Sequence, residues 1–422
     1  MADQPRVVIV GGGFAGLYLA KGLKRAPVQV TLIDRRNHHL FQPMLYQVAT
    51  AALNPANIAS PIRSILRRQE NVDVILGEVE QVDLAAHQVR LTDGTSVPYD
   101  YCAIATGARH SYFGHPEWEA LAPGIKSLDD ALEVRRRIFL AFERAERETN
   151  PQRRQSLLTF VVIGGGPTGV EVAGALAEIR RYALARDFRH IDPREATVVL
   201  LEGGPRILAG YPPALSYRAK SDLRALGVDV RENSFVTTIH PDAVEAAGWR
   251  IPTNTVVWAA GNQASPLLRT LGVPLDTQGR VIVESDCSVP GHPSVLVLGD
   301  AAAFQDAKSG GLVPAVCPAA IQMGGYAART IRASVAGVPR KPFQYWNKGE
   351  LAVIGRGDAV ANLPGLRFGG FLAWFIWIFL HITYLIGFRN RLLVLIEWAW
   401  SYVTYARGAR LITGDVRPGT SN

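Results

Sequence analysis

The sequence has little cysteine, and none of it is arranged for metal binding or for a disulfide framework. Its three cysteines, Cys102, Cys287 and Cys317, form no CxxC pair, and no histidine stands beside them at a metal-ligand spacing. Isolated cysteines of this kind are usually small buried hydrophobic residues. The sequence therefore predicts no metal site, and it fits a reducing compartment better than an oxidising one.

Other features are also missing. No low-complexity tract or long block of like charge interrupts the 422 residues, which excludes a largely disordered chain. The N-terminal MADQPRVVIVGGG has no charged segment followed by an apolar one, so no cleaved signal is expected. The net charge of +8 comes from scattered arginines without interleaved aromatic residues, so nucleic acid is less favoured as a partner than phosphate-bearing ligands or an anionic membrane surface.

Glycine, by contrast, is abundant at 40 residues, and two glycine-rich motifs have the same layout. VVIVGGGFAGLYLA from Val7 and FVVIGGGPTGVEVA from Phe160 each predict a strand, a turn and a helix. The first glycine permits the turn, the third lets phosphates approach the backbone, and the last lets helix and strand pack closely. In the two motifs, the first glycine is Gly11 or Gly164, the third is Gly13 or Gly166, and the last is Gly16 or Gly169. The positive helix ends would face a pyrophosphate, so two dinucleotide sites are predicted.

An acidic residue at the end of the next strand would bind a ribose hydroxyl. Asp34 stands about twenty residues after the first turn, as this motif requires. Glu202 comes later after the second turn, and we interpret the charged stretch 179–196 as a lengthened helical crossover. An acid at position 202 favours NADH over NADPH because it would repel a 2'-phosphate. Either acid could instead only cap the end of a strand.

Two dinucleotides in one chain suggest that one of them is a redox relay such as flavin. SVPYDYCAIATGARHSYFG leads to Thr106 and Gly107, and HPSVLVLGDAAAF leads to Gly299 and Asp300. Both segments resemble the motifs by which two-dinucleotide flavoprotein reductases hold FAD. The implied fold class is α/β, with two Rossmann-like domains and a C-terminal helical region. We expect an FAD domain from 1–115 and 285–340, an NADH domain from 116–284 and a membrane-associating region from 341–422.

Three narrower segments carry a closer resemblance: GGGPTGVE with Glu171, VPAVCPAAIQMGGYAA from Val313, and the tail HITYLIGFRNRLLVLIEWAWSYVTYARGARLITG. Together they resemble the type II NADH dehydrogenases, which are single-subunit, non-pumping NADH:quinone oxidoreductases. The resemblance implies a respiratory enzyme that passes hydride from NADH to non-covalent FAD, and then two electrons and two protons to a membrane quinone. A redox disulfide, which many members of the wider superfamily use, is excluded by the unpaired cysteines.

The resemblance also implies individual roles. Glu171 would be a catalytic or proton-relay carboxylate, although it could simply be an acid in the first turn of a helix, stabilised by the helix dipole. Gln322 would be the polar contact to the quinone. The implied FAD residues are Gly11, Gly13, Phe14, Ala15, Gly16, Asp34, Arg35, Gln42, Val79, Thr106, Gly107, Gly299, Asp300 and Ala319. The implied NADH residues are Gly164, Gly166, Pro167, Thr168, Gly169, Glu202, Ala260 and Gly261. The implied quinone pocket consists of Cys317, Pro318, Ile321, Gln322, His381 and Tyr384.

One departure from the family pattern concerns the quinone motif. Many members have Ala-Gln-x-Ala-x-Gln where this chain has Cys317-Pro318-Ala319-Ala320-Ile321-Gln322. Pro318 has neither a side-chain donor nor a backbone N–H, so a hydrogen bond from the first glutamine of the motif is not expected here.

The tail contains the apolar run FGGFLAWFIWIFLHITYLIGF, from Phe368 to Phe388. Its length would allow a spanning helix, but its aromatic residues, spread along the run, favour a helix in the membrane interface. A buried core helix also stays open. We expect two helices, about 366–388 and 390–407. The charged residues Arg389, Arg391, Glu397, Arg407 and Arg410 make the second one a basic amphipathic helix on an anionic lipid surface. These features imply a peripheral protein on the cytoplasmic face of a prokaryotic inner membrane, and a homodimer through the tail is plausible.

Three other functions are weighed against this one. A sulfide:quinone oxidoreductase needs cysteines placed to carry sulfur, and it does not need a complete NADH site. A soluble NADH-dependent reductase of a small electron-transfer protein would have no use for the tail. A flavin-binding sensor without turnover would bind FAD and yet not be reduced by NADH.

Overall fold

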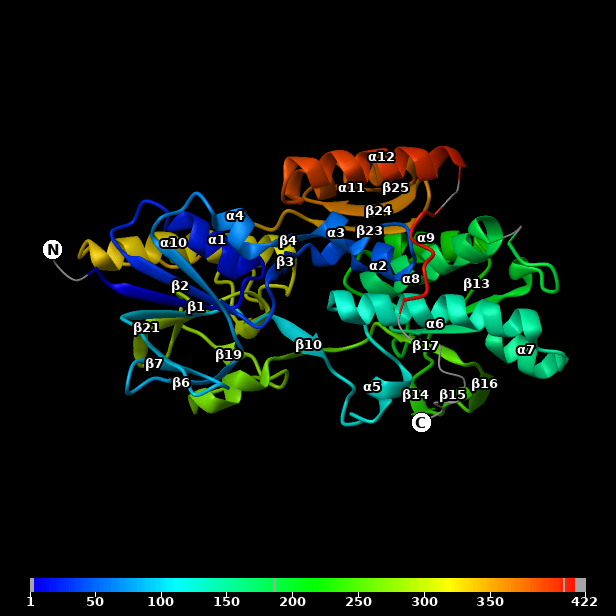
Figure 1. Cartoon of the computed structure of the whole chain (residues 1–422), viewed down its shortest axis with the longest axis horizontal. Coiled ribbons are helices and arrows are strands. Elements are labelled where there is room, and N and C mark those ends of the chain that lie inside the picture. Colours follow the sequence, from blue (N-terminus) through cyan, green and yellow to red (C-terminus); the bar gives the residue numbers. More distant parts are fainter. Residues whose placement is uncertain (1–3, 185–186, 405–406, 414–422) are drawn as a thin grey trace. The chain divides into compact units, whose positions relative to one another are not determined.

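The computed structural model describes residues 4–184, 187–404 and 407–413. The chain forms two compact units, each built from three separate segments (Figure 1). The first unit comprises Met1–Leu40, Ala59–Arg109 and Asn262–Lys348, and the second comprises Phe41–Ile58, His110–Gly261 and Gly349–Asn422.

The first unit is built on a six-stranded sheet with strand order β20-β21-β9-β1-β2-β5. All neighbours pair in parallel except β20, which is antiparallel to β21. β1 and β9 are buried, as expected for the centre of a parallel sheet. The strands and α-helices that lie wholly within this unit are β1 (Arg6–Val10), α1 (Phe14–Gly22), β2 (Gln29–Asp34), β3 (His38–Leu40), β4 (Ala59–Pro61), α4 (Ile62–Leu66), β5 (Val72–Leu76), β6 (Val79–Asp83), β7 (Gln88–Leu91), β8 (Ser96–Pro98), β9 (Tyr101–Ile104), β18 (Asn262–Ala264), β19 (Val281–Ile282), β20 (Ser288–Val289), β21 (His292–Val297), β22 (Ala302–Ala303) and α10 (Cys317–Val335).

Helices α1 and α10 of the first unit cross at close range. A Cβ atom added to Gly324 would lie 2.2 Å from the carbonyl oxygen of Ala15, and one added to Gly22 would lie 2.5 Å from the Cβ of Ala328. Only glycine allows the two backbones to approach so closely. The crossing places the first turns of α10 beside the first glycine-rich turn.

The second unit contains a four-stranded parallel sheet with order β13-β12-β11-β17 and an antiparallel meander β14-β15-β16. Its elements up to residue 258 are α2 (Leu45–Ala49), α3 (Pro55–Ile58), α5 (Trp118–Leu121), α6 (Leu128–Arg147), α7 (Pro151–Leu157), β11 (Thr159–Ile163), α8 (Pro167–Glu178), β12 (Thr197–Leu201), α9 (Pro213–Ala225), β13 (Val228–Arg231), β14 (Val236–Ile239), β15 (Ala243–Ala246), β16 (Trp249–Pro252) and β17 (Thr255–Trp258). The charged crossover before Glu202 is present, but it begins with a π-helical turn, Ile179–Ala183, and includes a 3-10 turn, Pro193–Glu195.

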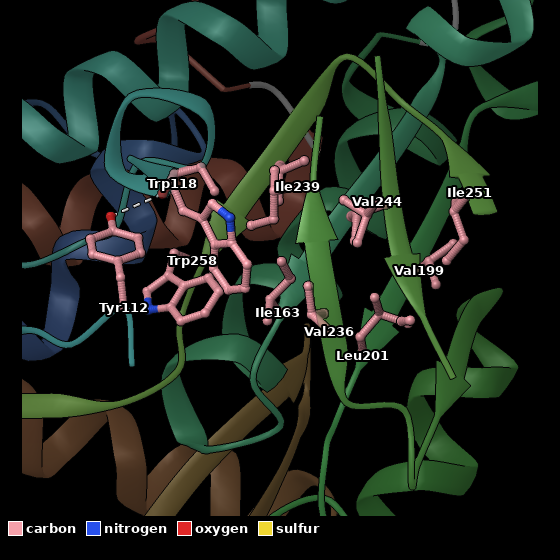
Figure 2. Close-up of a cluster of buried hydrophobic side chains, with 14 residues drawn as sticks. Tyr112, Trp118, Ile163, Val199, Leu201, Val236, Ile239, Val244, Ile251 and Trp258 are labelled. Atoms are coloured by element: carbon pink, nitrogen blue, oxygen red, sulfur yellow. Dashed lines mark hydrogen bonds between the residues drawn. The ribbon is translucent and has the colours of Figure 1, made fainter. Parts of the chain in front are cut away.

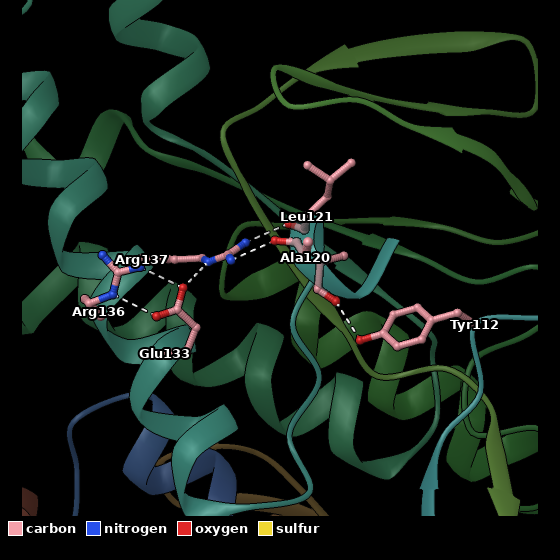
Figure 3. Close-up of polar contacts among 7 residues, drawn as sticks. Tyr112, Ala120, Leu121, Glu133, Arg136 and Arg137 are labelled. Carbon is pink, nitrogen blue, oxygen red and sulfur yellow. Dashed lines mark hydrogen bonds and ion pairs between the residues drawn. The ribbon is translucent and has the colours of Figure 1, made fainter. Parts of the chain in front are cut away.

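A buried apolar cluster joins the sheet of the second unit to the meander (Figure 2). Tyr112 and Trp118 pack around Trp258, with ring centroids 5.0 and 5.8 Å from that of Trp258. Arg137 of α6 donates to the carbonyl oxygens of Leu121 and Ala120, both at 2.8 Å, while its guanidinium also pairs with Glu133 (Figure 3). These contacts hold the segment from Tyr112 to Leu121 against α6 and against β17, the strand that ends at Trp258.

The C-terminal segment is part of the second unit. It forms a three-stranded antiparallel sheet of β23 (Glu350–Gly355), β24 (Asp358–Leu363) and β25 (Leu366–Gly369), followed by α11 (Phe371–Tyr384) and α12 (Phe388–Thr404). α11 packs on this sheet, and α12, at the top of Figure 1, contacts α11 and α3. A Cβ atom on Gly174 of α8 would lie 1.7 Å from the carbonyl oxygen of Ile354. The tail sheet therefore packs directly on the helix of the second glycine-rich motif.

The division into units differs from the predicted domain boundaries. Residues 262–284, expected in the NADH domain, belong to the first unit, and residues 41–58 belong to the second. The C-terminal region, expected as a separate part from residue 341, is included in the second unit from Gly349. Which ligand each unit binds stays a prediction from the motifs.

The predicted tail helices need correction. The first begins at Phe371, because residues 366–369 form β25, and the second ends at Thr404. Among the described residues, no helix combines the length and the apolar character needed to cross a membrane. Arg407 and Arg410 lie beyond α12, and both form ion pairs within the unit, with Glu178 and Asp187. These two arginines therefore do not belong to an amphipathic helix that faces lipid.

Candidate active site

The first glycine-rich turn has the geometry that its spacing predicts. Gly11 has a φ of 106°, and a Cβ atom on Gly16 would lie 1.8 Å from the carbonyl oxygen of Gly11. A Cβ atom on Gly13, in contrast, would meet nothing within 4 Å. Asp34 accepts from the backbone N–H of Gly12 at 2.5 Å and of Arg36 at 2.7 Å. The turn is therefore tightly built at two glycines and open at the third, where phosphates would approach.

Four predicted FAD segments follow neighbouring parallel strands at their carboxyl ends. Gly11 follows β1, Asp34 ends β2, Thr106 follows β9 and Gly299 follows β21. Carboxyl ends of parallel strands meet at one edge of a sheet, where such folds bind nucleotides. Two buried polar atoms here, Nε2 of His39 and the hydroxyl of Thr106, have no hydrogen-bond partner among the described residues. The hydroxyl, phosphate and amide groups of FAD would supply such partners, so the residues present fit this cofactor.

The other predicted FAD residues come from several different elements. Phe14, Ala15 and Ala319 lie in the first turns of α1 and α10, Gly107 follows Thr106, Asp300 follows Gly299, and Val79 begins β6. Arg35 forms an exposed ion pair with Glu78 at 3.8 Å. Gln42 lies in the second unit, where its amide donates to the carbonyl oxygen of Lys126 at 3.3 Å. The structure thus does not bring Gln42 together with the others within one unit.

The second glycine-rich turn repeats the first almost contact for contact. Gly164 has a φ of 107°, a Cβ atom on Gly169 would lie 1.8 Å from the carbonyl oxygen of Gly164, and one on Gly166 would meet nothing within 4 Å. Glu202 accepts from the N–H of Gly165 at 2.6 Å and of Gly204 at 2.7 Å. Pro167 and Thr168 open α8 and are exposed, and Ala260 and Gly261 follow β17. All eight predicted NADH residues therefore lie at one edge of the second sheet.

Glu171 lies one turn further along α8 and borders a cavity of about 110 Å³ within the second unit. The residue is half-buried, but protein atoms enclose its carboxyl group, and this desolvation raises the pKa of Glu171 to about 8. A hydrogen bond with the backbone of Val353 opposes the shift. At neutral pH the carboxyl is therefore mostly protonated and able to donate a proton.

The predicted quinone residues fall into two groups, one in each unit. Cys317, Pro318, Ile321 and Gln322 occupy the first two turns of α10 in the first unit, and His381 and Tyr384 lie on α11 in the second. The amide of Gln322 donates to the carbonyl oxygen of Trp346 and accepts from its N–H, both at 3.0 Å. Burial raises the pKa of Cys317 well above its usual range.

His381 is neutral at physiological pH. Burial lowers its pKa to about 4, despite a hydrogen bond between its Nδ1 and the carbonyl oxygen of Trp377 at 2.8 Å. Its ring stacks on that of Trp377, with centroids 4.0 Å apart, and meets Phe41 edge-on at 6.0 Å. Its ring is thus packed against Trp377 and Phe41.

Sequence reasoning missed three polar residues of the cavity beside Glu171. Tyr46 of α2, Glu178 of α8 and Arg407 of the tail line it together with Glu171. Glu178 follows Glu171 by seven residues, a spacing that puts both acids on one helix face, so Glu178 could have been found. Tyr46 and Arg407 carry no comparable local signal.

Comparisons with known proteins agree with this geometry. Residues 5–324 match the family described as pyridine nucleotide-disulphide oxidoreductase, which is the class that the fold and the two nucleotide turns define. Residues 347–404 match the NDH2 C-terminal domain. Within that class, the chain belongs to the type II NADH:quinone oxidoreductase family.

The relatives are similar over most of their length. The chain is 45% identical over 423 residues to the type II NADH:quinone oxidoreductase Ndh of Mycobacterium tuberculosis, with 97% of this chain and 90% of that protein covered. It is 46% identical to NdhA of the same organism, with 99% and 91% covered. The solved structure of NDH2 from Plasmodium falciparum in complex with NADH has the same fold, with a TM-score of 0.87 at 19% identity, covering 96% of this chain and 99% of that one.

Proposed function

We propose that this chain is an NADH:quinone oxidoreductase that converts NADH, a quinone and one proton to NAD⁺ and a quinol. The observation that carries the proposal is the position of Glu171. It follows the last glycine of the second nucleotide turn by two residues, and it borders a cavity that α2, the tail sheet and both tail helices also line. A protonated acid is thus held between a nucleotide turn and an apolar segment, as a reaction between NADH and a lipid-soluble acceptor requires.

The residues of the two turns would bind and orient the nucleotides. Asp34 and Glu202 would each orient a ribose at the end of a second strand, and the open backbones at Gly13 and Gly166 would accept the phosphates. FAD, when bound, supplies acceptance of hydride from NADH and delivery of two electrons to a quinone. The carboxyl of Glu171 would hold a proton for transfer to the acceptor.

The acceptor site proposed from the motifs comprises Cys317, Pro318, Ile321 and Gln322 of α10, with His381 and Tyr384 of α11 as further contacts. Gln322 supports this role because each end of its amide retains the capacity for one more hydrogen bond beyond those to Trp346. His381 is less favourable as a polar contact, since Trp377 already occupies its Nδ1.

The tail helices support peripheral attachment to a membrane. Phe371, Phe375 and Phe379 form an exposed stripe on α11, and a second stripe on α12 includes Phe388, Leu392, Ile396, Trp400 and Val403. Apolar stripes at helical spacing suit a helix lying in the membrane interface. The apolar side chains provide most of this attraction, because Arg407 and Arg410 are ion-paired within the unit. The same stripes could join two copies of the chain, and we propose the cytoplasmic face of a prokaryotic inner membrane as the location.

The cysteines weigh against a sulfide:quinone oxidoreductase. Cys102 and Cys287 are fully buried, and neither they nor the half-buried Cys317 is paired with another cysteine in the described chain. Sulfur transfer needs accessible cysteines on the reaction path. Replacement of all three by serine should leave NADH:quinone activity in place. Loss of this activity in the serine variant, together with reduction of quinone by sulfide in the wild type, would favour the alternative.

The test of the function is a pair of spectra. NADH added without oxygen to the purified holoprotein should bleach the flavin absorbance near 450 nm, and a quinone added next should restore it. A flavin that NADH does not bleach would point to a binding protein without turnover. A flavin that is bleached by NADH, but reoxidised only by a small electron-transfer protein, would point to a soluble reductase.

A further inference from the structure

The cavity beside Glu171 contains a second acid, which is held in the opposite charge state. Glu178 lies two helical turns further along α8, roughly 10 Å away on the same face. It forms an ion pair with Arg407 at 3.0 Å and accepts from the N–H of Arg356 at 2.6 Å. One end of the cavity therefore carries a neutral acid and the other an ionised pair.

Tyr46 lines the same cavity as Glu171, Glu178 and Arg407. The pKa of its buried hydroxyl is raised well above its ordinary value, first by desolvation and next by Glu171, and Glu178 adds to the effect. Arg407 and a hydrogen bond with Gln47 act in the opposite direction. The other titratable or charged groups around the cavity are Tyr182 and Arg356, which line it, and Tyr211, whose pKa is raised by burial and then by Glu350 and Glu171.

The hydroxyl of Tyr46 is oriented by a fixed amide. Nε2 of Gln47 donates to it at 3.1 Å, and the indole N–H of Trp398 fixes Gln47 by donating to its Oε1 at 2.7 Å. An amide nitrogen cannot accept a hydrogen bond, so the proton of Tyr46 points away from Gln47. Tyr46 lines the cavity, and the cavity is where its proton has space to go.

The proposed reaction needs a proton supply. Forming a quinol makes two O–H bonds with two electrons, and NADH brings two electrons with one proton. The second proton must come from water at each turnover. We propose, on the basis of the proposed function, that Tyr46 relays protons to Glu171 from the Glu178–Arg407 end of the cavity. In each cycle Glu171 gives its proton to the acceptor side. Tyr46 then gives its hydroxyl proton to the Glu171 carboxylate and, in the same step, takes a replacement proton from the solvent end, so that no buried tyrosinate forms.

The deciding variant is Tyr46→Phe, which keeps the ring and removes the relay atom. In the FAD-loaded protein, NADH should bleach the flavin at the wild-type rate, and turnover with ferricyanide, which takes up no protons, should be unchanged. Turnover with a short-chain ubiquinone should fall at least tenfold at pH 8 and recover partly at pH 6, where protons are more available. Tyr99→Phe is the matched control, because it removes a buried hydroxyl bonded to the carbonyl oxygen of Asp83, far from the cavity along the chain.

Two outcomes would overturn the relay. One is a Tyr46→Phe protein with the quinone turnover and pH profile of Tyr99→Phe. The other is an equal loss with ferricyanide and quinone, which would indicate a structural role. If Tyr46→Phe does not fold, the double variant Glu178→Gln/Arg407→Gln tests the relay instead. It should fold, because removing both partners of the ion pair leaves no unpaired buried charge. It should lower quinone turnover about threefold or more at pH 8 and spare ferricyanide. A wild-type protein that NADH bleaches but no quinone reoxidises would instead overturn the proposed function itself.

Discussion

Single glycines in the two nucleotide turns differ sharply in what they tolerate. A side chain at Gly16 or Gly169 would collide with backbone, whereas Gly13 and Gly166 have open space in front of them. Gly166 also has an ordinary extended conformation, with φ at −71°, so a side chain there causes no backbone strain. The fold therefore does not require glycine at this position, and we expect that a bound phosphate does.

Gly166→Ala should consequently separate binding from folding. We expect a melting temperature near that of the wild type, since the N-cap change costs about 1 kcal/mol, and an NADH KM raised about tenfold or more because the methyl group occupies the phosphate position. Thermal melting and an NADH titration of flavin bleaching measure the two effects. Gly169→Ala is the matched contrast and should not give a folded second unit. Equal NADH affinity in Gly166→Ala and wild type would contradict a phosphate site at this turn.

We expect Glu171 to make the reaction dependent on pH. Its pKa is raised to about 8, so its carboxyl is a proton donor below that pH and a carboxylate above it. Quinone turnover should therefore decline as the pH rises through about 8. Glu171→Gln should lower quinone turnover by at least tenfold and remove this pH dependence, while bleaching by NADH persists. Steady-state rates between pH 6 and 10 test this, with the exposed Glu143→Gln on α6 as control. A Glu171→Gln protein with an unchanged alkaline decline would show that another group controls it.

At the scale of the element, the second tail helix presents two different faces. Trp398, Ser401 and Tyr402 line the cavity, while Ile396 and Trp400 point to solvent. The helix thus contributes to the second unit on one side and offers an apolar stripe on the other. This division explains why its composition alone did not distinguish a core helix from an interfacial one.

Loss of the stripe should weaken binding to lipid and leave the chemistry intact. Ile396→Ser/Trp400→Ser removes two apolar side chains, each worth about 2 kcal/mol on burial in an apolar phase, so partition onto vesicles should fall at least tenfold. Sedimentation with liposomes measures the partition, and turnover with ferricyanide shows whether the rest of the enzyme is intact. Trp249→Ser is the control, because Trp249 is 68% exposed, like Trp400 at 65%, but lies in the meander. Equal loss in both variants would argue against a specific membrane face.

At the scale of the whole molecule, the end of the tail is part of the packed structure of the second unit. Arg407 donates to the carbonyl oxygen of Thr50 at 2.7 Å and pairs with Glu178, so the last described segment joins α8 and the end of α2. Its side chain is only 7% exposed. A buried pair of this kind is expensive to break, since the remaining charge is left without a partner.

Truncation after Thr404 should therefore destabilise the second unit by about 3–5 kcal/mol. Truncation after Thr413 removes none of the described contacts and should melt like the full chain. Differential scanning calorimetry of the two FAD-loaded proteins makes the comparison. If both truncations melt alike, the Arg407 pair contributes nothing to stability.

The sequence by itself determined the two nucleotide turns, their acids and the α/β class, because a strand, a turn and a helix within about thirty residues are local structures whose glycine spacing is set by backbone sterics. It also singled out Glu171. Only the tertiary structure decided what surrounds Glu171, because Tyr46 precedes it by more than a hundred residues and the Glu178–Arg407 pair joins positions 229 apart. Local spacing says nothing about such contacts. The tail shows the same limit, since an arginine beside apolar residues has the same sequence pattern whether it faces lipid or turns inward to an acid.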